Sequence, residues 1–253
     1  FKSSKIKMKI IAMILTYNNQ NLVDQALAKI PKDLFENIFV TDDCSTDKTA
    51  QIYRKKGIRV FETDKNRGYG GNVKNGLKSA IENFDFDYIV EIHGDGAQFD
   101  PSATYDAIKF MEKNYDFIIG SRFIDREETK RGGMSKLRYY ANIILSSLAE
   151  KFFKLGITEY HTGFRIYSKN YLSTVDWKNC SDGHLFSFET LALVAFHKLK
   201  IAEVKCYCDY NNLHTSISII NSIIFTFLHF NTMIQYYLSK FNLSLSKLFK
   251  KNK

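Results

Sequence analysis

The chain has 253 residues, enough for one large domain or for one domain with a small appendage. A content of 45% hydrophobic and 15% aromatic residues provides for a packed core and excludes a globally disordered protein. The formal net charge of +9 favours an anionic partner, such as nucleic acid, a phosphorylated small molecule or a membrane surface.

Strand-like and helix-like segments alternate through the first half of the chain. Residues 9–17 form a continuous apolar run, which is typical of a strand buried on both faces. The same reading places further strands at 37–43, 58–63, 87–94 and 116–123, and helices at 21–30, 45–57, 68–84 and 101–114. This order predicts an α/β fold, with a mostly parallel sheet flanked by helices.

The second half has a different pattern. A charged, glycine-containing loop is expected at 126–136, followed by a long helix at 137–155 and a polar loop that enters a short strand at 158–168. The remaining expected elements are a helix at 185–198, a strand at 201–208 and an apolar helix at 216–241. We therefore predict a main domain over residues 1–215 and a C-terminal helix with a basic tail over residues 216–253.

The C-terminal helix has almost the length of a membrane span, about 20 residues, but polar residues interrupt it. Its pattern disfavours a true span and leaves two interpretations open. The helix packs against protein, within the chain or in a homo-oligomer, or it lies on a membrane surface with its lysines toward anionic lipid. The cysteines form no CxxC pair and no secretory signal is recognisable, which indicates reduced thiols and a cytoplasmic location. The second interpretation of the helix adds peripheral contact at the inner face of the membrane.

Polar clusters follow the first, second and fourth predicted strands. Ligands of parallel α/β sheets bind outside the carboxyl ends of the strands, so we expect these clusters to share one crevice. In the second cluster Asp42 and Asp43 are adjacent and point in opposite directions, so only one of them can face that crevice. Helix capping by Asp43, Ser45 and Asp47 is the alternative interpretation.

The stretch "NRGYGGNVKNG", residues 66–76, is a glycine-rich turn that opens a helix. Exposed backbone N–H groups at a helix start attract phosphate, and Arg67 and Lys74 lie nearby. A dinucleotide-binding fingerprint is disfavoured, because Val73 occupies the position of its third glycine.

The stretch "HGDGAQFD", residues 93–100, collects metal-ligand types at a strand end. Asp95, assisted by Gln98 or Asp100, would hold Mg²⁺ or Mn²⁺, which offsets the charge of a departing diphosphate. The alternative is an ordinary turn in which Asp100 caps the helix that begins near Pro101. We favour that alternative for Asp100 and the metal for Asp95.

Together these segments resemble the inverting family 2 glycosyltransferases of the GT-A fold, akin to dolichyl-phosphate mannose synthase. The resemblance covers about residues 9–215 and rests on motifs that occur in a fixed order: "MILTYNN", "VTDDCSTDKT", "NRGYGGNVKNG", "EIHGDGAQFDP", "IIGSRF", "RGGMSKLRYYAN" and "TEYHTGFRIYS". Each motif is weak alone, and the ordered series is specific.

The resemblance implies a nucleoside-diphosphate-sugar donor and a divalent cation held by Asp95, with Gln98 a doubtful ligand because the usual spacing is stretched by one residue. The donor site is then expected to include Thr16, Tyr17, Asp42, Asp43, Arg67, Gly68, Lys74, Gly94, Asp95, Arg122, Arg131 and His161. His93 stands where the family's first metal-segment aspartate is expected, and Ser187 stands where relatives often have aspartate. For Arg122 a structural ion pair, and for His161 a loop cap, remain open alternatives.

The expected acceptor is a polyprenyl phosphate or a cell-surface glycan intermediate. A sugar hydroxyl would need a carboxylate base, for which Glu189 and Asp182 are the candidates, whereas a lipid phosphate is already ionised. Arg165 is expected near the phosphates or the acceptor, with a structural ion pair as the alternative, and burial against an arginine is the alternative for Glu189. His214 is considered as a late metal ligand.

The sequence therefore predicts a metal-dependent inverting hexosyltransferase. The positive charge, the apolar last helix and the lysine tail favour a lipid-linked acceptor. Two other classes stay open: a sugar-phosphate nucleotidyltransferase, and a non-catalytic relative that binds a sugar nucleotide. A nucleic-acid partner is not expected, because the positive residues are scattered and no recognition motif is found.

Overall fold

The computed structural model describes residues 8–95, 99–210, 219–243 and 246–250, with the backbone alone for 219–223. Its first part alternates strands and helices as predicted: β1 (Ile10–Thr16), α1 (Val23–Lys29), β2 (Asn37–Asp42), α2 (Thr49–Lys55), β3 (Arg59–Glu62), α3 (Gly68–Asn83), β4 (Tyr88–His93), α4 (Ala103–Met111) and β5 (Phe117–Ser121). The remaining helices and strands are α5 (Arg126–Arg131), α6 (Lys136–Phe153), β6 (Arg165–Ser168), α7 (Lys169–Thr174), α8 (Phe186–His197), β7 (Ile201–Lys205) and α9 (Ile219–Ser239). Short 3₁₀ turns occur at Lys32–Leu34 and Trp177–Asn179.

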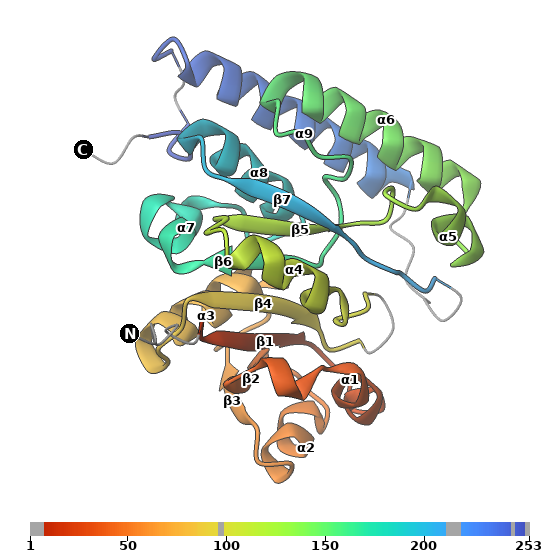
Figure 1. Cartoon of the computed structure of the whole chain (residues 1–253), viewed down its shortest axis with the longest axis vertical. Coiled ribbons are helices and arrows are strands. Elements are labelled where there is room, and N and C mark those ends of the chain that lie inside the picture. The colour runs from red at the N-terminus through yellow and green to blue at the C-terminus, as the bar shows by residue number, and fades with distance from the viewer. Residues whose placement is uncertain (1–7, 96–98, 211–218, 244–245, 251–253) are drawn as a thin grey trace, which may run out of the picture.

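The strands form one seven-stranded sheet in the order β3-β2-β1-β4-β6-β5-β7 (Figure 1). The pairs β1–β2, β1–β4, β2–β3 and β5–β7 are parallel, and β6 alone runs antiparallel to its neighbours β4 and β5. The predicted mostly parallel, GT-A-type sheet with flanking helices is confirmed. The antiparallel β6 places its first residue, Arg165, opposite Glu91 of β4.

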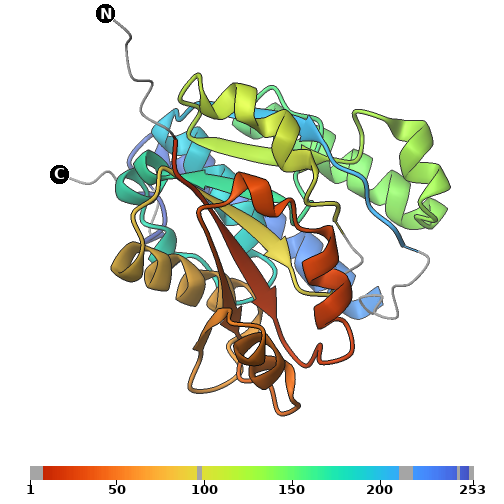
Figure 2. The ribbon, with the colours of Figure 1, turned by 60° about the horizontal axis from the view of Figure 1, so that its bottom comes forward.

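Helices cover both faces of the sheet. Successive residues of a strand point to opposite faces, so both sets of side chains are enclosed. Every residue of β1 is buried. Ile11 and Met13 pack with α3 and α8 on one face, while Ala12 and Ile14 pack with α1 and α4 on the other. Figure 2 shows α1 and α3 on opposite sides of β1. A continuous apolar strand is therefore required here, in agreement with its sequence.

The expected loop at 126–136 is wrong over its first half, which forms helix α5. The side chain of Asp125 caps this helix by accepting a hydrogen bond from the backbone N–H of Glu128. Acidic residues lie in its first turn and Lys130 and Arg131 in its last, which suits the helix dipole. The strand expected at 201–208 is also shorter, because β7 ends at Lys205. Helix α7, capped by Ser168, was not predicted.

Helix α9 packs beside α6 and over α8 (Figure 1). Met233 and Tyr236 enter the same hydrophobic core as α3 and α8, and the Tyr236 ring meets Phe153 of α6 edge-on, with 4.9 Å between ring centroids. None of the described helices has the length and apolar character needed to cross a membrane. The separate C-terminal unit at 216–253 stays a prediction, although α9 shares the core of the main domain.

Candidate active site

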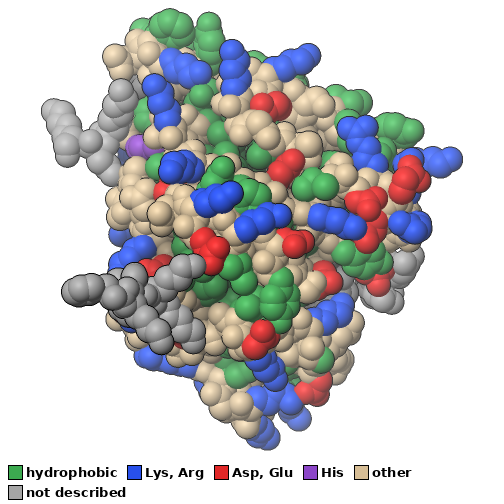
Figure 3. Space-filling view, in the orientation of Figure 1, with side chains coloured by type: hydrophobic (Ala, Val, Ile, Leu, Met, Phe, Trp, Pro, Cys, Tyr) green, Lys and Arg blue, Asp and Glu red, His purple; other side chains and the backbone are tan. Residues whose placement is uncertain are grey.

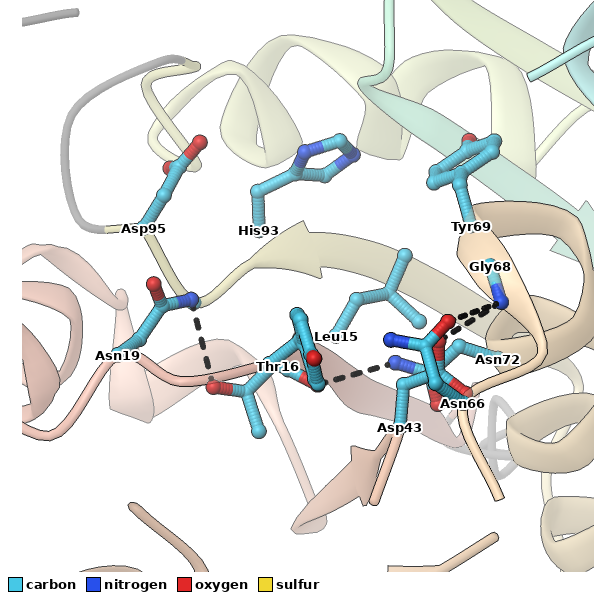
Figure 4. Close-up of a pocket in the computed structure, with 12 residues that line it drawn as sticks. Leu15, Thr16, Asn19, Asp43, Asn66, Gly68, Tyr69, Asn72, His93 and Asp95 are labelled. Atoms are coloured by element: carbon cyan, nitrogen blue, oxygen red, sulfur yellow. Dashed lines mark hydrogen bonds between the residues drawn. The ribbon is translucent and has the colours of Figure 1, made fainter. Parts of the chain in front are cut away.

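A pocket of about 240 Å³ opens where β1, β2 and β4 end and α3 begins (Figure 4). Its lining brings together all three polar clusters that follow these strands, as predicted. Among the described residues it is lined by Leu15, Thr16, Tyr17, Asn19, Asp43, Asn66, Gly68, Tyr69, Asn72, His93, Gly94 and Asp95. Six predicted donor-site residues are in that lining: Thr16, Tyr17, Asp43, Gly68, Gly94 and Asp95.

The two adjacent aspartates after β2 have different tasks. One carboxylate oxygen of Asp43 accepts a hydrogen bond from the backbone N–H of Arg67 and the other from that of Gly68, both at 2.8 Å (Figure 4). Asp42 turns away and accepts from the backbone N–H and the hydroxyl of Ser45. Burial raises the pKa of Asp42. Of the two, Asp43 alone faces the pocket, and it also fixes the start of α3.

Two asparagines complete the floor and were not predicted. The amide of Asn72 donates to the backbone carbonyls of Thr16 and Thr41, which joins α3 to the ends of β1 and β2. The amide of Asn19 donates to the hydroxyl of Thr16 at 3.4 Å. The motif "GYGGNV" contained Asn72, but only the folded helix shows that this side chain points back to the sheet.

A buried polar group underlies the end of β4. Glu91 is fully buried and accepts hydrogen bonds from the hydroxyls of Tyr69 and Tyr167, both at 2.6 Å. The Nε2 atom of His93 lies 3.3 Å from the same Glu91 oxygen that Tyr69 contacts. Burial and the negative charge of Glu91 raise the pKa of Tyr69 well above its usual range. Neither Glu91 nor Tyr69 was predicted, because β4 reads as an ordinary buried strand.

A metal site can be judged from the donor atoms available. The described residues contain no group of three or more His, Cys, Asp or Glu side chains arranged to hold a metal ion. Gln98 and His214, both considered as ligands, lie outside the described residues. The pocket does present the carboxylate of Asp95 and the imidazole of His93 together (Figure 4). A divalent cation bound mainly by substrate phosphates needs only one or two protein ligands, so these donor types fit such a cation.

Several other predicted residues lie at the rim or beneath it. Lys74 makes an ion pair with Asp182 and donates to the carbonyl of Cys180 at 2.7 Å. Arg67 pairs with Asp64 at the surface. The carbonyl of Asp182 accepts a hydrogen bond from the backbone N–H of Gly71 at 2.9 Å. Residues 180–183 therefore rest against the start of α3, beside the pocket but outside its lining.

Glu189 is buried and accepts hydrogen bonds from the backbone N–H and the hydroxyl of Ser181, at 2.6 and 2.9 Å. Its partner is thus a serine and not the arginine considered from the sequence. Burial raises the pKa of its carboxyl group, and the bonds from Ser181 act in the opposite direction. Glu189 does not line the pocket. Its bond to Ser181 places it directly behind the segment that contains Asp182.

The predicted arginines and His161 also lie outside the pocket lining. Arg122 forms a buried two-pronged ion pair with Glu159, at 2.7 and 2.8 Å. Arg165 is fully buried and donates to the carbonyls of Thr162 and Ser187 and to the hydroxyl of Thr190. Arg131 is exposed at the end of α5.

The ring of His161 stacks on Phe188 and lies 5.2 Å from the ring of His229 on α9. Burial and nearby positive charge lower the pKa of His161 well below its usual range. The roles expected for this histidine and for the arginines remain predictions.

The fold and the pocket define a GT-A-type transferase architecture, and comparison with known proteins agrees. A structure of glucosyl-3-phosphoglycerate synthase from Mycobacterium tuberculosis, in complex with Mn²⁺, UDP and glucosyl-3-phosphoglycerate, superposes with a TM-score of 0.65. The two chains are 14% identical, and the match covers 95% of this chain and 82% of the other. At this identity the likeness concerns the fold.

The chain belongs to glycosyl transferase family 2, whose model matches residues 12–176. The UDP-N-acetylglucosamine–dolichyl-phosphate N-acetylglucosaminyltransferase of Methanococcus voltae is 25% identical over 218 residues, covering 78% of this chain and 84% of that protein. A 3-deoxy-manno-octulosonate cytidylyltransferase of Rickettsia felis is 24% identical over 180 residues, covering 67% and 69%. The predicted family and enzyme class, a family 2 glycosyltransferase, are confirmed.

Proposed function

We propose that this glycosyltransferase is metal-dependent and inverting, and that it moves a hexosyl unit from a nucleoside-diphosphate sugar to a polyprenyl phosphate. The observation that carries the proposal is the pocket that joins Asp43, His93 and Asp95 at the carboxyl ends of three strands. The similarity to a transferase that acts on dolichyl phosphate supports the lipid acceptor. A cell-surface glycan intermediate is the alternative acceptor.

The donor is proposed to lie with its nucleoside against Thr16, Tyr17 and Asp43. Tyr17 is 43% exposed at the rim, where its ring can stack on a base. The diphosphate would extend toward Asp95 and the N-terminus of α3, whose backbone N–H groups suit anions. When bound there, Mg²⁺ or Mn²⁺ would offset the negative charge on the departing diphosphate.

In the transfer step an acceptor oxygen forms a bond to the anomeric carbon. The bond from that carbon to the diphosphate oxygen breaks, and its electron pair leaves with the diphosphate. A lipid phosphate is already ionised and releases no proton in this step. For a sugar hydroxyl, Asp182 or Glu189 would take up the proton, and the raised pKa of Glu189 is the direction that suits such a base.

A lipid acceptor requires access to a membrane surface, for which α6 and α9 are suited. Leu137, Tyr140 and Ile144 of α6 are all at least 60% exposed, and their spacing puts them on one face of the helix. The exposed apolar residues of α9 and its end follow the same spacing: Phe227, Phe230, Ile234, Tyr237 and Phe241. We call these two rows the α6–α9 apolar rows. An amphipathic helix pair of this kind can lie on a bilayer with its apolar side chains inserted.

Positive charge accompanies the apolar rows. Lysines surround an apolar hollow of about 500 Å³ between α6, α8 and α9, namely Lys154, Lys198, Lys200 and Lys240. Figure 3 shows Lys and Arg side chains spread over the upper part of this face, with apolar side chains at its top edge. Such charge attracts anionic lipid head groups.

We propose peripheral contact with the cytoplasmic leaflet. Pairing of two chains through α9 is the competing use of the same surface.

The function can be tested with the full chain, Mn²⁺, UDP- and GDP-sugars, and either a short polyprenyl phosphate or a soluble sugar acceptor. Formation of a polyprenyl-phosphate sugar of the expected mass, with release of nucleoside diphosphate, is the predicted result. Transfer to the soluble sugar alone would replace the lipid acceptor by a glycan. Absence of any transfer, with nucleotide binding retained, would favour a non-catalytic role.

The similarity to a cytidylyltransferase makes a nucleotidyltransferase the second candidate. Its reaction joins a sugar phosphate to a nucleoside triphosphate and releases pyrophosphate. The same enzyme preparation should therefore be supplied with CTP or UTP and sugar phosphates, and separately with CTP and the free sugar acid 3-deoxy-manno-octulosonate, whose hydroxyl would displace pyrophosphate directly. Pyrophosphate release in that assay, without sugar transfer in the first, would overturn the proposed function.

A further inference from the structure

The end of β4 holds a histidine where the resemblance to family 2 glycosyltransferases predicts a metal-segment aspartate. His93 and Asp95 are two residues apart, and both line the pocket. Figure 4 shows the imidazole ring between Asp95 and Tyr69, with one ring nitrogen toward each side. The side chain of His93 is 18% exposed, so most of its ring is held within the protein.

The orientation of the ring is fixed on its inner side. Its Nε2 atom lies 3.3 Å from Glu91, and Glu91 is itself held by the hydroxyls of Tyr69 and Tyr167. The Phe99 ring meets the imidazole edge-on, with centroids 5.2 Å apart. A Cβ atom on Gly163 would come within 2.6 Å of Nε2, so only glycine leaves room for the ring. These contacts give the imidazole one position.

This arrangement also selects the tautomer. A carboxylate can only accept hydrogen bonds, so contact with Glu91 places the imidazole proton on Nε2. The lone pair then resides on Nδ1, the nitrogen that remains for the pocket. A ligating histidine commonly donates its other N–H to a carboxylate, which orients the ring and raises its basicity. Glu91 and His93 have the geometry of such a pair.

We propose that His93 ligates the divalent cation of the donor complex through Nδ1, beside Asp95, with Glu91 as the positioning carboxylate. This inference rests on the proposed function, because the donor phosphates would supply most of the remaining ligands. It assigns to His93 the place for which a carboxylate was expected. It also predicts that this site prefers Mn²⁺ over Mg²⁺ more strongly than a site with two carboxylates would. Mg²⁺ prefers oxygen ligands, whereas imidazole nitrogen suits the first-row transition metals.

The direct test is electron spin-echo envelope modulation of Mn²⁺ bound to the full chain with UDP, and in parallel with GDP and CDP. A ligating imidazole adds nitrogen modulation to the spectrum. Labelling the protein with ¹⁵N-histidine should change that modulation, which separates it from backbone and base nitrogens. This measurement uses the unaltered protein and needs no turnover.

Variants assign the signal to one residue. His93→Asp should lose the nitrogen modulation and still bind Mn²⁺, because a carboxylate replaces the imidazole. His184→Gln is the matched control, since His184 stacks on Tyr69 near the pocket, with 5.5 Å between centroids, but does not line it. It should retain the modulation. Glu91→Gln should weaken Mn²⁺ binding by about 10- to 100-fold, as is typical when the partner of a metal-bound histidine is changed.

Competition between Mg²⁺ and Mn²⁺ in the nucleotide complex gives the second readout. In His93→Asp, with Asp95 unchanged, the preference for Mn²⁺ over Mg²⁺, measured as the ratio of the two dissociation constants, should fall about tenfold. If Mn²⁺ and nucleotide bind together without histidine nitrogen modulation, or if His184→Gln loses it, the inference fails and the proposed function stands. If none of the three nucleotides binds in a metal-dependent way, the proposed metal dependence and this inference fail together.

Discussion

Glu91 on β4 and Arg165 on β6 are direct partners across the antiparallel junction of the sheet, and both are fully buried. Side chains of such partners lie on the same face. Glu91 accepts hydrogen bonds from two tyrosines, and Arg165 donates to carbonyls around it. Opposite charges are thus enclosed side by side at the β4–β6 junction, one of the two antiparallel junctions that β6 makes in the described sheet.

Replacing Arg165 with methionine should be strongly destabilising. The change leaves Glu91 without its opposite charge and leaves the carbonyls of Thr162 and Ser187 without a donor. Leaving a buried acceptor without its donor typically costs about 1–3 kcal/mol for each group, and the uncompensated charge of Glu91 adds to this. The measurement is the free energy of unfolding in urea at neutral pH. Arg54→Ala, which removes an exposed ion pair with Glu62, is the control and should cost about 1 kcal/mol or less.

Coupling between the two buried charges can be isolated with the double variant Glu91→Gln, Arg165→Met. We expect it to be more stable than the sum of the two single changes predicts, because neither charge then remains alone. Strict additivity would show that Arg165 stabilises the fold only through its carbonyl contacts.

Sequence reasoning was sufficient for the sheet because β1, β2 and β4 contain apolar runs, and their ends carry the polar residues of the pocket. It was not sufficient where a contact depends on a partner distant in the chain. For Arg122 the sequence left a phosphate contact and a structural ion pair open, and only the fold shows the ion pair with Glu159. The sequence places Glu91 in a buried strand, but it does not show that Tyr167 of β6 donates a hydrogen bond to its carboxylate. Such pairings are set by topology, which local patterns do not encode.

Gly70→Ala should disturb the pocket, because a Cβ atom there would lie 2.4 Å from the carbonyl oxygen of Ser181 and 2.6 Å from Cβ of Phe186. The start of α3 and residues 181–183 would have to separate. Overpacking of this kind typically costs about 1–3 kcal/mol. Urea unfolding and nucleotide titration should both show the loss. Gly183→Ala, where a Cβ atom would meet nothing within 4 Å, should leave both unchanged.

Asp43 and Asp95 should affect nucleotide binding in different ways. Asp43→Asn removes the charge that holds the N–H groups of Arg67 and Gly68, so affinity should fall about tenfold or more with or without Mn²⁺. Asp95→Ala should leave the metal-free affinity unchanged and remove the gain that Mn²⁺ provides. Isothermal titration with UDP, GDP and CDP separates the two effects. Full metal-assisted binding in Asp95→Ala would contradict the metal role of this carboxylate.

Acid should destabilise the protein through His229. Burial lowers its pKa to about 4, while an unfolded histidine has a pKa of about 6.5. Between these values the unfolded state binds more protons, so the free energy of unfolding falls as the pH falls. The contribution of neutral His229 to the free energy of unfolding is fully present above about pH 6.5, and about 3 kcal/mol of it is lost by about pH 4.

Urea unfolding at several pH values measures this loss. His229→Phe removes the titrating ring and should flatten the profile in that window. Residual slope is still expected from His161, whose pKa is lowered in the same direction. An unchanged profile in both His229→Phe and the double variant with His161→Phe would exclude the α8–α9 contact as the acid-sensitive part.

The α6–α9 apolar rows should decide membrane binding. The double variant Phe227→Glu, Ile234→Glu places two charges on the exposed side of α9, where the native side chains are 75% and 52% exposed. Each charge disfavours insertion into the apolar part of a bilayer, so flotation with anionic liposomes should be lost while folding is retained. Ile81→Glu is the matched control, because Ile81 is 49% exposed on α3, far along the chain from both rows. Native protein that fails to float, and instead forms a dimer that the double variant dissociates in light scattering, would assign these rows to a second copy of the chain.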